Sequence, residues 1–166
     1  MSVMRATELP EIWTQDGMLV VSPAPSLPHQ IAVTRLAVAL NAACPPGLLV
    51  VTGPGVNINK FQHRVPDLVV MRAESITPMF MTDPPVLAVE VASPRTRLYD
   101  RGRKREVYER FGIPSYWIVD VGQEEPSLTV FDLRRGKYTQ TARVAADEAF
   151  HAAKPFPVTI VPAELL

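Results

Sequence analysis

The sequence predicts a mixed α/β fold, with a central mixed β-sheet, two main helices and flanking β-hairpins. Short apolar runs alternate with two stretches of helical periodicity, near residues 29–43 and 98–111. The order is hairpin, helix, three or four strands, helix, strand and hairpin, which is typical of a mixed sheet with few helices. Residues 85–94 are apolar on both faces and bounded by prolines, as expected of a buried central strand.

The 166 residues suffice for a substantial core, and we expect a single domain over residues 1–166. Seventeen Lys and Arg balance seventeen Asp and Glu, so any anionic partner must meet a local basic patch. The single Cys44 excludes an intrachain disulfide, and no apolar run reaches the roughly 18 residues of a membrane helix. We therefore expect a soluble cytoplasmic protein with no membrane partner.

The first helix follows a hairpin at residues 11–22 and a proline-rich connector. It is expected to end before Pro45. One stripe of this helix carries the core-facing side chains together with an imidazole: His29, Val33, Leu36 and Leu40. The remaining strands are expected at 48–52, 56–61, 64–71, 85–94, 115–121, 128–132, 137–141 and 158–161.

Lys104 lies on the apolar side of the second helix. Because a helix turns by about 100° per residue, Asp100, Lys104, Val107 and Phe111 share one stripe. Tyr108 lies at the edge of that stripe. A lysine among the sheet-facing side chains predicts a charged partner in the core.

Asp67, Glu90 and Lys104 occupy positions where a core should be apolar. Two carboxylates on neighbouring strands would repel one another, and a divalent cation would remove that conflict. Mg²⁺ prefers oxygen ligands and is commonly held by one or two carboxylates, waters and a substrate phosphate. A nearby ammonium can stabilise the phosphorus or polarise the attacking water, so these residues fit phosphodiester hydrolysis.

These residues also carry a resemblance to a known family. Pro66–Asp67, followed by Glu90 after 22 residues, resembles the PD-(D/E)xK nuclease superfamily with its restriction-endonuclease-like core. A longer run resembles the Uma-type branch of restriction endonucleases, through Glu90–Pro94, Asp100, Lys104, Tyr108, Gly112–Ile113 and Tyr116–Asp120. The helix after Pro28 and the Phe156–Pro157 tail also fit that branch.

The resemblance implies catalytic and metal-binding roles for the two acids. Asp67 and Glu90 would be ligands of Mg²⁺ or Mn²⁺, with the carbonyl of Val91 as a third ligand. Lys104 would assist the attacking water or the transition state.

The lysine departs from the superfamily pattern. Two residues after Glu90, where that lysine normally stands, this sequence has Ala92. In the Uma-type pattern the lysine comes from the following helix, which here is Lys104. Asp100 would hold its ammonium through an i,i+4 pair, and His29 would support the site or contact a phosphate.

A basic cluster lies beside the proposed metal site. Seven of the seventeen basic residues fall between positions 95 and 110. Five of them are expected to contact DNA: Arg95, Arg97, Arg101, Arg103 and Arg105. Such contacts would make binding fall with salt, although interspersed acids also suit a solvated helix face.

Each candidate also has a structural interpretation. The acids could be satisfied by backbone donors or arginines, and Lys104 could extend to solvent. Asp100 could be an acid that the helix dipole favours in the first turn, and His29 could have a structural role alone. Other chemistries are poorly supported, since one cysteine and three scattered histidines give no zinc spacing and no P-loop is present.

The sequence therefore predicts an Mg²⁺- or Mn²⁺-dependent endonuclease that hydrolyses DNA. Two alternatives stay open. Ala92 suggests a catalytically silent nucleic-acid-binding module on the same fold, and the neutral overall charge suggests a protein-interaction scaffold. The apolar hairpins could bury a dimer contact, which leaves a homodimer open as well.

Overall fold

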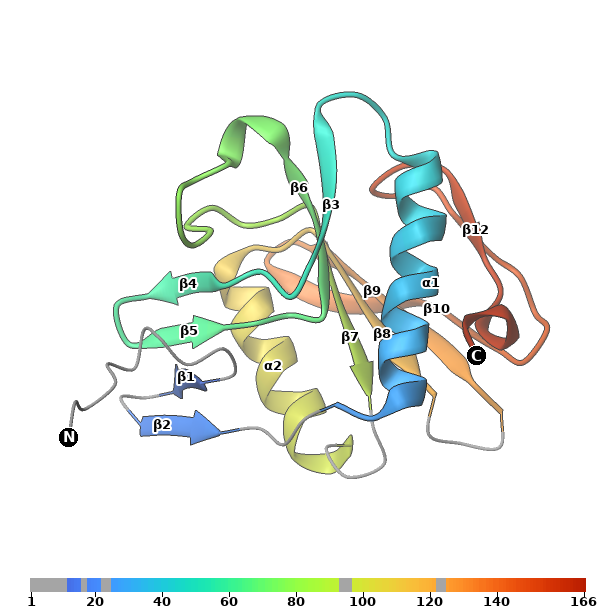
Figure 1. The fold of residues 1–166 in the computed structure, drawn as a ribbon, viewed down its shortest axis with the longest axis horizontal. Coiled ribbons are helices and arrows are strands. Elements are labelled where there is room, and N and C mark those ends of the chain that lie inside the picture. The colour runs from blue at the N-terminus through green and yellow to red at the C-terminus, as the bar shows by residue number, and fades with distance from the viewer. Residues whose placement is uncertain (1–11, 16–17, 22–24, 93–96, 122–124) are drawn as a thin grey trace.

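The computed structural model describes residues 12–15, 18–21, 25–92, 97–121 and 125–166, with the backbone alone for 12–15, 18–21 and 97–101 (Figure 1). The helices are α1 (Leu27–Ala43), α2 (Arg97–Phe111) and the short 3₁₀ segments η2 (Ala73–Ser75) and η3 (Pro162–Leu165). The strands are β1 (Ile12–Gln15), β2 (Met18–Val21), β3 (Leu48–Thr52), β4 (Val56–Asn59), β5 (Gln62–Arg64), β6 (Leu68–Arg72), β7 (Leu87–Ala92), β8 (Ser115–Asp120), β9 (Ser127–Arg134), β10 (Lys137–Ala145), β11 (Phe150–Ala152) and β12 (Val158–Ile160).

Within the described residues, six strands form the central sheet in the order β10-β9-β8-β7-β6-β3. β7 and β8 run parallel, and the other neighbouring pairs are antiparallel. Parallel neighbours require a crossover connection, and α2 provides it. The predicted mixed α/β fold with two main helices is therefore confirmed.

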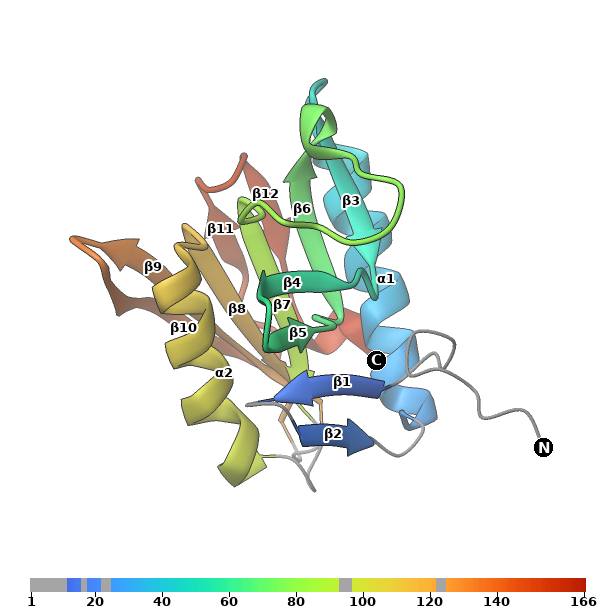
Figure 2. The ribbon, with the colours of Figure 1, turned by 90° about the vertical axis from the view of Figure 1, so that its left-hand side faces the viewer.

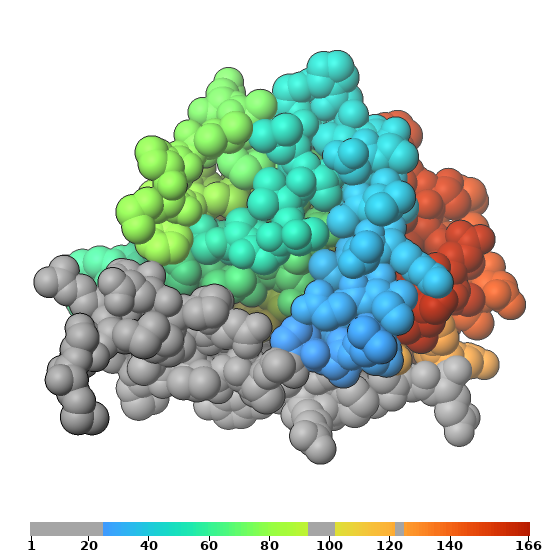
Figure 3. All heavy atoms as spheres, in the orientation of Figure 1, coloured from blue at the N-terminus to red at the C-terminus, as the bar shows by residue number. Residues whose placement is uncertain are grey.

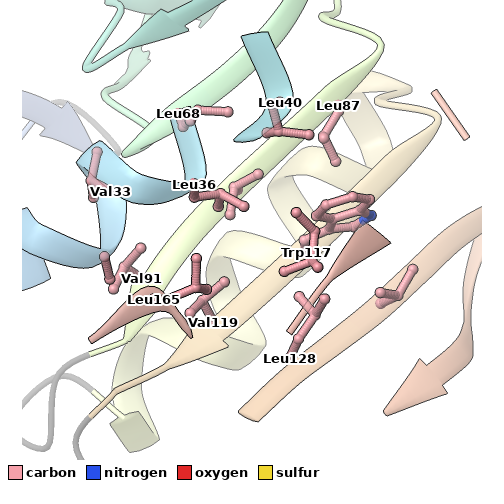
Figure 4. Packing of buried hydrophobic residues seen from close by; sticks show 14 of the residues in the cluster. Val33, Leu36, Leu40, Leu68, Leu87, Val91, Trp117, Val119, Leu128 and Leu165 are labelled. Carbon is pink, nitrogen blue, oxygen red and sulfur yellow. The ribbon is translucent and has the colours of Figure 1, made fainter. Parts of the chain in front are cut away.

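The helices α1 and α2 cover opposite faces of this sheet (Figures 1 and 2). On the α1 face the core includes Leu36, Leu40, Leu68, Leu87, Trp117 and Leu128, several of which Figure 4 labels. On the α2 face it includes Val69, Ala88, Val107, Tyr108, Tyr116 and Ile118. The sheet is thus buried on both sides, which explains why its central strands read as continuous apolar runs.

The strand β7 lies in the middle of the sheet, and all six of its residues are buried. Leu87, Val89 and Val91 contribute to the core on the α1 face, whereas Ala88 and Ala92 contribute to the core on the α2 face. Because side chains alternate along a strand, Glu90 faces α2. The prediction of a buried central strand carrying one carboxylate is confirmed.

The prediction of one strand over residues 64–71 is wrong. β5 ends at Arg64 and β6 begins at Leu68, and β5 pairs with β4 in a separate hairpin. Pro66 lies in the break and has no N–H to donate to a ladder, which separates the two strands. Asp67 therefore occupies the entrance to β6 rather than the middle of a longer strand.

The remaining predicted hairpins form, with longer strands than expected in the second. β1 pairs with β2, and β9 pairs with β10 across a turn in which Arg135 and Gly136 both have positive φ. The tail adds a small sheet, β11 with β12, that the sequence indicated only in part.

The C-terminal residues pack beside α1 and form one continuous surface with it (Figure 3). Arg35 of α1 donates to the carbonyl of Glu164 at 3.1 Å and to that of Leu166. In the part of the chain that is described, no helix combines the length and apolar character needed to cross a membrane.

Candidate active site

Glu90 is a buried carboxylate with two different partners. The residue is 7% exposed. Its Oε2 accepts a hydrogen bond from Lys104 Nζ at 2.8 Å, and its Oε1 accepts one from the hydroxyl of Tyr108 at 2.7 Å. Lys104 and Tyr108 are four residues apart on α2, so their side chains share one face of the helix. An ammonium and a hydroxyl together compensate the charge that burial disfavours.

The electrostatics of Glu90 reflect this setting. Burial raises the pKa of Glu90 because desolvation disfavours the ionised form; Lys104 opposes that shift and Asp67 adds to it. The two carboxylates are therefore close enough to repel one another. Burial and the charge of Glu90 hold the pKa of Tyr108 well above its ordinary value, so Tyr108 stays protonated and remains a donor.

Asp67 ties β6 to β7 through its side chain. Backbone pairing between these strands runs from Val70 opposite Leu87 to Leu68 opposite Val89. Beyond that point Asp67 Oδ2 accepts a hydrogen bond from the amide of Val91 at 2.7 Å. The carboxylate thus continues the ladder where the backbone pairing ends, one residue beyond Glu90.

His29, in the first turn of α1, reaches the same carboxylate. Its Nε2 lies 3.2 Å from Asp67 Oδ1, and the two side chains are 12% and 23% exposed. The hydrogen bond to Asp67 raises the pKa of His29; burial opposes this, the charges of Asp67 and Glu90 raise it further, and Lys104 lowers it. The pKa of His29 therefore depends on the charges of Asp67, Glu90 and Lys104 together.

These side chains form a single group, which we call the acid–lysine cluster: His29, Asp67, Glu90, Lys104 and Tyr108. The structure brings together the four members that the sequence indicated, from α1, the entrance to β6, β7 and α2. The interpretation in which Lys104 extends to solvent without a core partner is wrong. For Asp67, the expectation of a backbone donor is partly correct, since it accepts from Val91.

The donor chemistry of the cluster fits a hard divalent cation. Each carboxylate oxygen has two lone pairs, so the hydrogen bonds described here leave acceptor capacity on Asp67 and Glu90. Oxygen donors suit Mg²⁺ and Mn²⁺, which commonly complete their coordination with waters and a substrate phosphate. Among the residues that the structure describes, no three His, Cys, Asp or Glu side chains form a metal site by themselves. An ion here would therefore need main-chain, water or substrate ligands as well.

Ala92 stands where the superfamily pattern has its lysine, and the geometry of the cluster is consistent with this difference. Ala92 is buried on the same face of β7 as Glu90, and Lys104 supplies the ammonium from α2 instead. Glu90 lies in the predicted buried strand and Lys104 on the predicted inward side of α2, whereas Asp67 lies before β6 rather than within a strand. The roles of all three residues stay predictions.

The other predicted site residues are described only in part. Arg95 and the side chains of Arg97, Asp100 and Arg101 lie outside the described residues. Arg103 and Arg105 are exposed on α2, and the guanidinium of Arg105 lies 5.3 Å from the ring centre of Phe131. Contact of these arginines with DNA stays a prediction.

Tyr108 is the member of the cluster to which the sequence assigned no role. The signal was available, because Tyr108 follows Lys104 by four residues and therefore lies on the same side of the helix. The sequence did not show how deeply the Tyr108 side chain is buried. Tyr108 is fully buried and meets Glu90 from inside the core.

The fold and the cluster together define a restriction-endonuclease-like α/β protein. The chain belongs to the Uma2 family, described as "Putative restriction endonuclease", whose family model matches residues 6–163. This membership supports a nuclease function.

A solved structure shares the fold. The crystal structure of "a putative nuclease belonging to DUF820 from Anabaena variabilis ATCC 29413" matches with a TM-score of 0.72 and 16% sequence identity, over 94% of this chain and 89% of that chain. At this identity the likeness concerns the fold alone. A search of curated proteins finds no match to this sequence.

Proposed function

We propose that the protein is a metal-dependent endonuclease that hydrolyses phosphodiester bonds in DNA. Family membership supports the nuclease class. The observation that carries the proposal of metal-dependent DNA cleavage is the convergence of Asp67, Glu90 and Lys104 at one end of the central strands. The two carboxylates are near enough to repel one another, and the ammonium lies between solvent and core.

Asp67, Glu90 and the carbonyl of Val91 would hold the cation. Bound there, Mg²⁺ or Mn²⁺ supplies Lewis-acid charge at the phosphate and lowers the pKa of the attacking water. Val91 supports this ligand set because its amide is fixed on Asp67, which keeps its backbone beside both acids.

The remaining members of the cluster act on these groups. Lys104 donates to a phosphate oxygen and stabilises the charge that develops as the bond from water to phosphorus forms and one P–O ester bond breaks. The attacking water gives up one proton and the leaving oxygen takes up one, so the products are a phosphate monoester and an alcohol. His29 orients Asp67 through the contact at 3.2 Å. The expected pairing of Asp100 with Lys104 concerns a side chain outside the described residues and stays a prediction.

DNA would approach along α2. Arg103 and Arg105 are exposed on this helix, which also carries Lys104, so a phosphate backbone that follows the helix surface meets positive charge on its way to the site. Arg95, Arg97 and Arg101 belong to the same basic run. Affinity should therefore fall steeply with salt.

Cleavage of supercoiled plasmid during a titration with Mg²⁺ or Mn²⁺ tests the proposal. Three variants each change one polar group of the site: Asp67→Asn, Glu90→Gln and Lys104→Met. The matched control is Lys137→Met, because Lys137 also donates to a glutamate at 2.8 Å but lies outside the cluster, on β10. We expect metal-dependent cleavage by the wild type and by the control, and none by the three site variants.

Two results would refute the proposal. Cleavage that persists in the presence of a chelator would show that the reaction does not depend on a metal. Cleavage that survives in Glu90→Gln would show that the acid–lysine cluster is not the active site. Salt-sensitive DNA binding without cleavage in any metal would instead identify a silent binding module.

A further inference from the structure

The two oxygens of Glu90 have partners that differ in burial. Tyr108 is fully buried, and its ring lies against Tyr116 with 5.4 Å between ring centres and an interplanar angle of 72°. Lys104 carries its ammonium on a flexible four-carbon stem, and its side chain is 21% exposed. One partner is therefore held by the core, and the other can move toward solvent.

We infer that Tyr108 is a positioning residue that holds Glu90 for the cation, and that Lys104 occupies Oε2 only until the cation binds. This inference rests on the proposed function and names the residue that prepares its metal ligand. Tyr108 stays on Oε1 throughout, and Lys104 is released from Oε2 and becomes available to the phosphate.

Charge explains why the two partners behave differently. An ammonium 2.8 Å from Oε2 would repel a divalent cation drawn to the same carboxylate. The hydroxyl of Tyr108 is neutral and directs its proton at Oε1, so it leaves lone pairs of the carboxylate available and competes with no cation. Without metal, Lys104 neutralises a buried acid. With metal, the ion takes over that task.

The positions of the two residues on α2 suit this exchange. They lie one turn apart on the same face, with Tyr108 in the core and Lys104 nearer the surface. Tyr108 thus fixes the direction of the Glu90 carboxylate from inside. Lys104 can withdraw without unpacking the helix, because its side chain is already partly exposed.

The test measures binding of Mn²⁺ to the full chain by isothermal titration calorimetry. Tyr108→Phe should weaken binding by about tenfold, the lower end of what loss of a hydrogen-bond partner of a metal ligand usually causes. Lys104→Met should tighten binding by about tenfold, because a like charge is removed from the ligand. The control is Tyr138→Phe, which deletes the same hydroxyl from a tyrosine that donates to the carbonyl of Ile113 at 2.8 Å instead. It should leave the affinity unchanged.

A second measurement uses the wild type and does not depend on the folding of any variant. NMR spectra are recorded with labels on the tyrosine Cζ and lysine Nζ atoms, with and without Mg²⁺. The Lys104 signal should move on metal binding, and the Tyr108 signal should stay near its metal-free position.

The outcomes separate this inference from the proposed function. If the wild type binds Mn²⁺ and Tyr108→Phe binds it equally well, Tyr108 does not position Glu90 and the inference fails while the proposed function stands. Weaker binding by Lys104→Met would refute the exchange, and so would a Lys104 signal that Mg²⁺ leaves in place. Absence of Mn²⁺ binding by the wild type would overturn both.

Discussion

Replacing Lys104 by Met should destabilise the fold at neutral pH. Glu90 would be left in its buried position without the ammonium that neutralises it. Methionine has nearly the length of lysine and a similar helix propensity, so the substitution removes the charge with little direct effect on α2.

The magnitude follows from the burial of the two partners. Removing one member of a buried ion pair typically costs about 3–5 kcal/mol. The Glu90 side chain is 9% exposed and that of Lys104 21%. Since Lys104 is partly solvated and Tyr108 still donates to the acid, we expect a loss of about 2–3 kcal/mol in the free energy of unfolding. Lys137→Met breaks a pair of the same length whose lysine is 81% exposed, and it should change stability far less.

The cost should also depend on pH, with a sign set by Glu90. Burial raises the pKa of this acid, and loss of Lys104 raises it further. A group whose folded pKa exceeds its unfolded pKa binds its proton more tightly in the folded state. The destabilisation is therefore absent below the unfolded pKa, where Glu90 is protonated in both states, and grows as the pH rises through the folded pKa.

Urea unfolding of the wild type and both variants between about pH 5 and about pH 9 measures this cost. We expect the midpoint of Lys104→Met to fall further below the wild type as the pH rises, and the midpoint of Lys137→Met to change little. Equal losses in the two variants would refute the assigned burial of the ion pair. A loss that shrinks toward alkaline pH would refute the assigned pKa shift.

Three further substitutions test other contacts. Asp67 holds the pKa of His29 above its ordinary value of 6.5, so their contact stabilises the fold below pH 6.5, and this stabilisation is lost as the pH rises through the folded pKa. Urea unfolding of His29→Gln should therefore show a larger loss of stability in acid than in alkali. Equal losses would contradict the assigned pKa shift. In Gly55→Ala the new Cβ would lie 2.5 Å from Phe80 Cδ1, and urea unfolding should show a loss of about 1–3 kcal/mol; an unchanged midpoint would mean that the ring moves freely. Arg105→Ala should reduce the slope of log DNA affinity against log salt concentration by about one, as measured by fluorescence anisotropy. An unchanged slope would show that Arg105 does not contact the DNA backbone.

Periodicity made Glu90 and Lys104 predictable. A two-residue alternation places Glu90 on one face of β7, and a 3.6-residue period places Lys104 on the inward side of α2. Each pattern predicts the direction in which a side chain points from its own strand or helix. The crossover topology then brings those two faces together, because α2 connects β7 to its parallel neighbour β8.

The details that the sequence did not predict depend on how elements meet. The break at Pro66 makes Asp67 the first side chain before β6, and its bond to Val91 exists because backbone pairing stops at Leu68. Periodicity places an imidazole on the inward stripe of α1, but the contact of His29 with Asp67 depends on how that helix docks on the sheet. Three-residue strands such as β11 are too short to carry a periodic signal.

The distribution of the cluster along the chain links its chemistry to the completion of folding. His29 and Tyr108 lie in different helices on opposite faces of the sheet, and the acids between them belong to β7 and the entrance to β6. Parallel pairing of β7 with β8 must wait until α2 and β8 have left the ribosome, and pairings between distant segments are slow to form. A nascent chain therefore carries the acids apart from the lysine, and only the completed fold contains the assembled acid–lysine cluster.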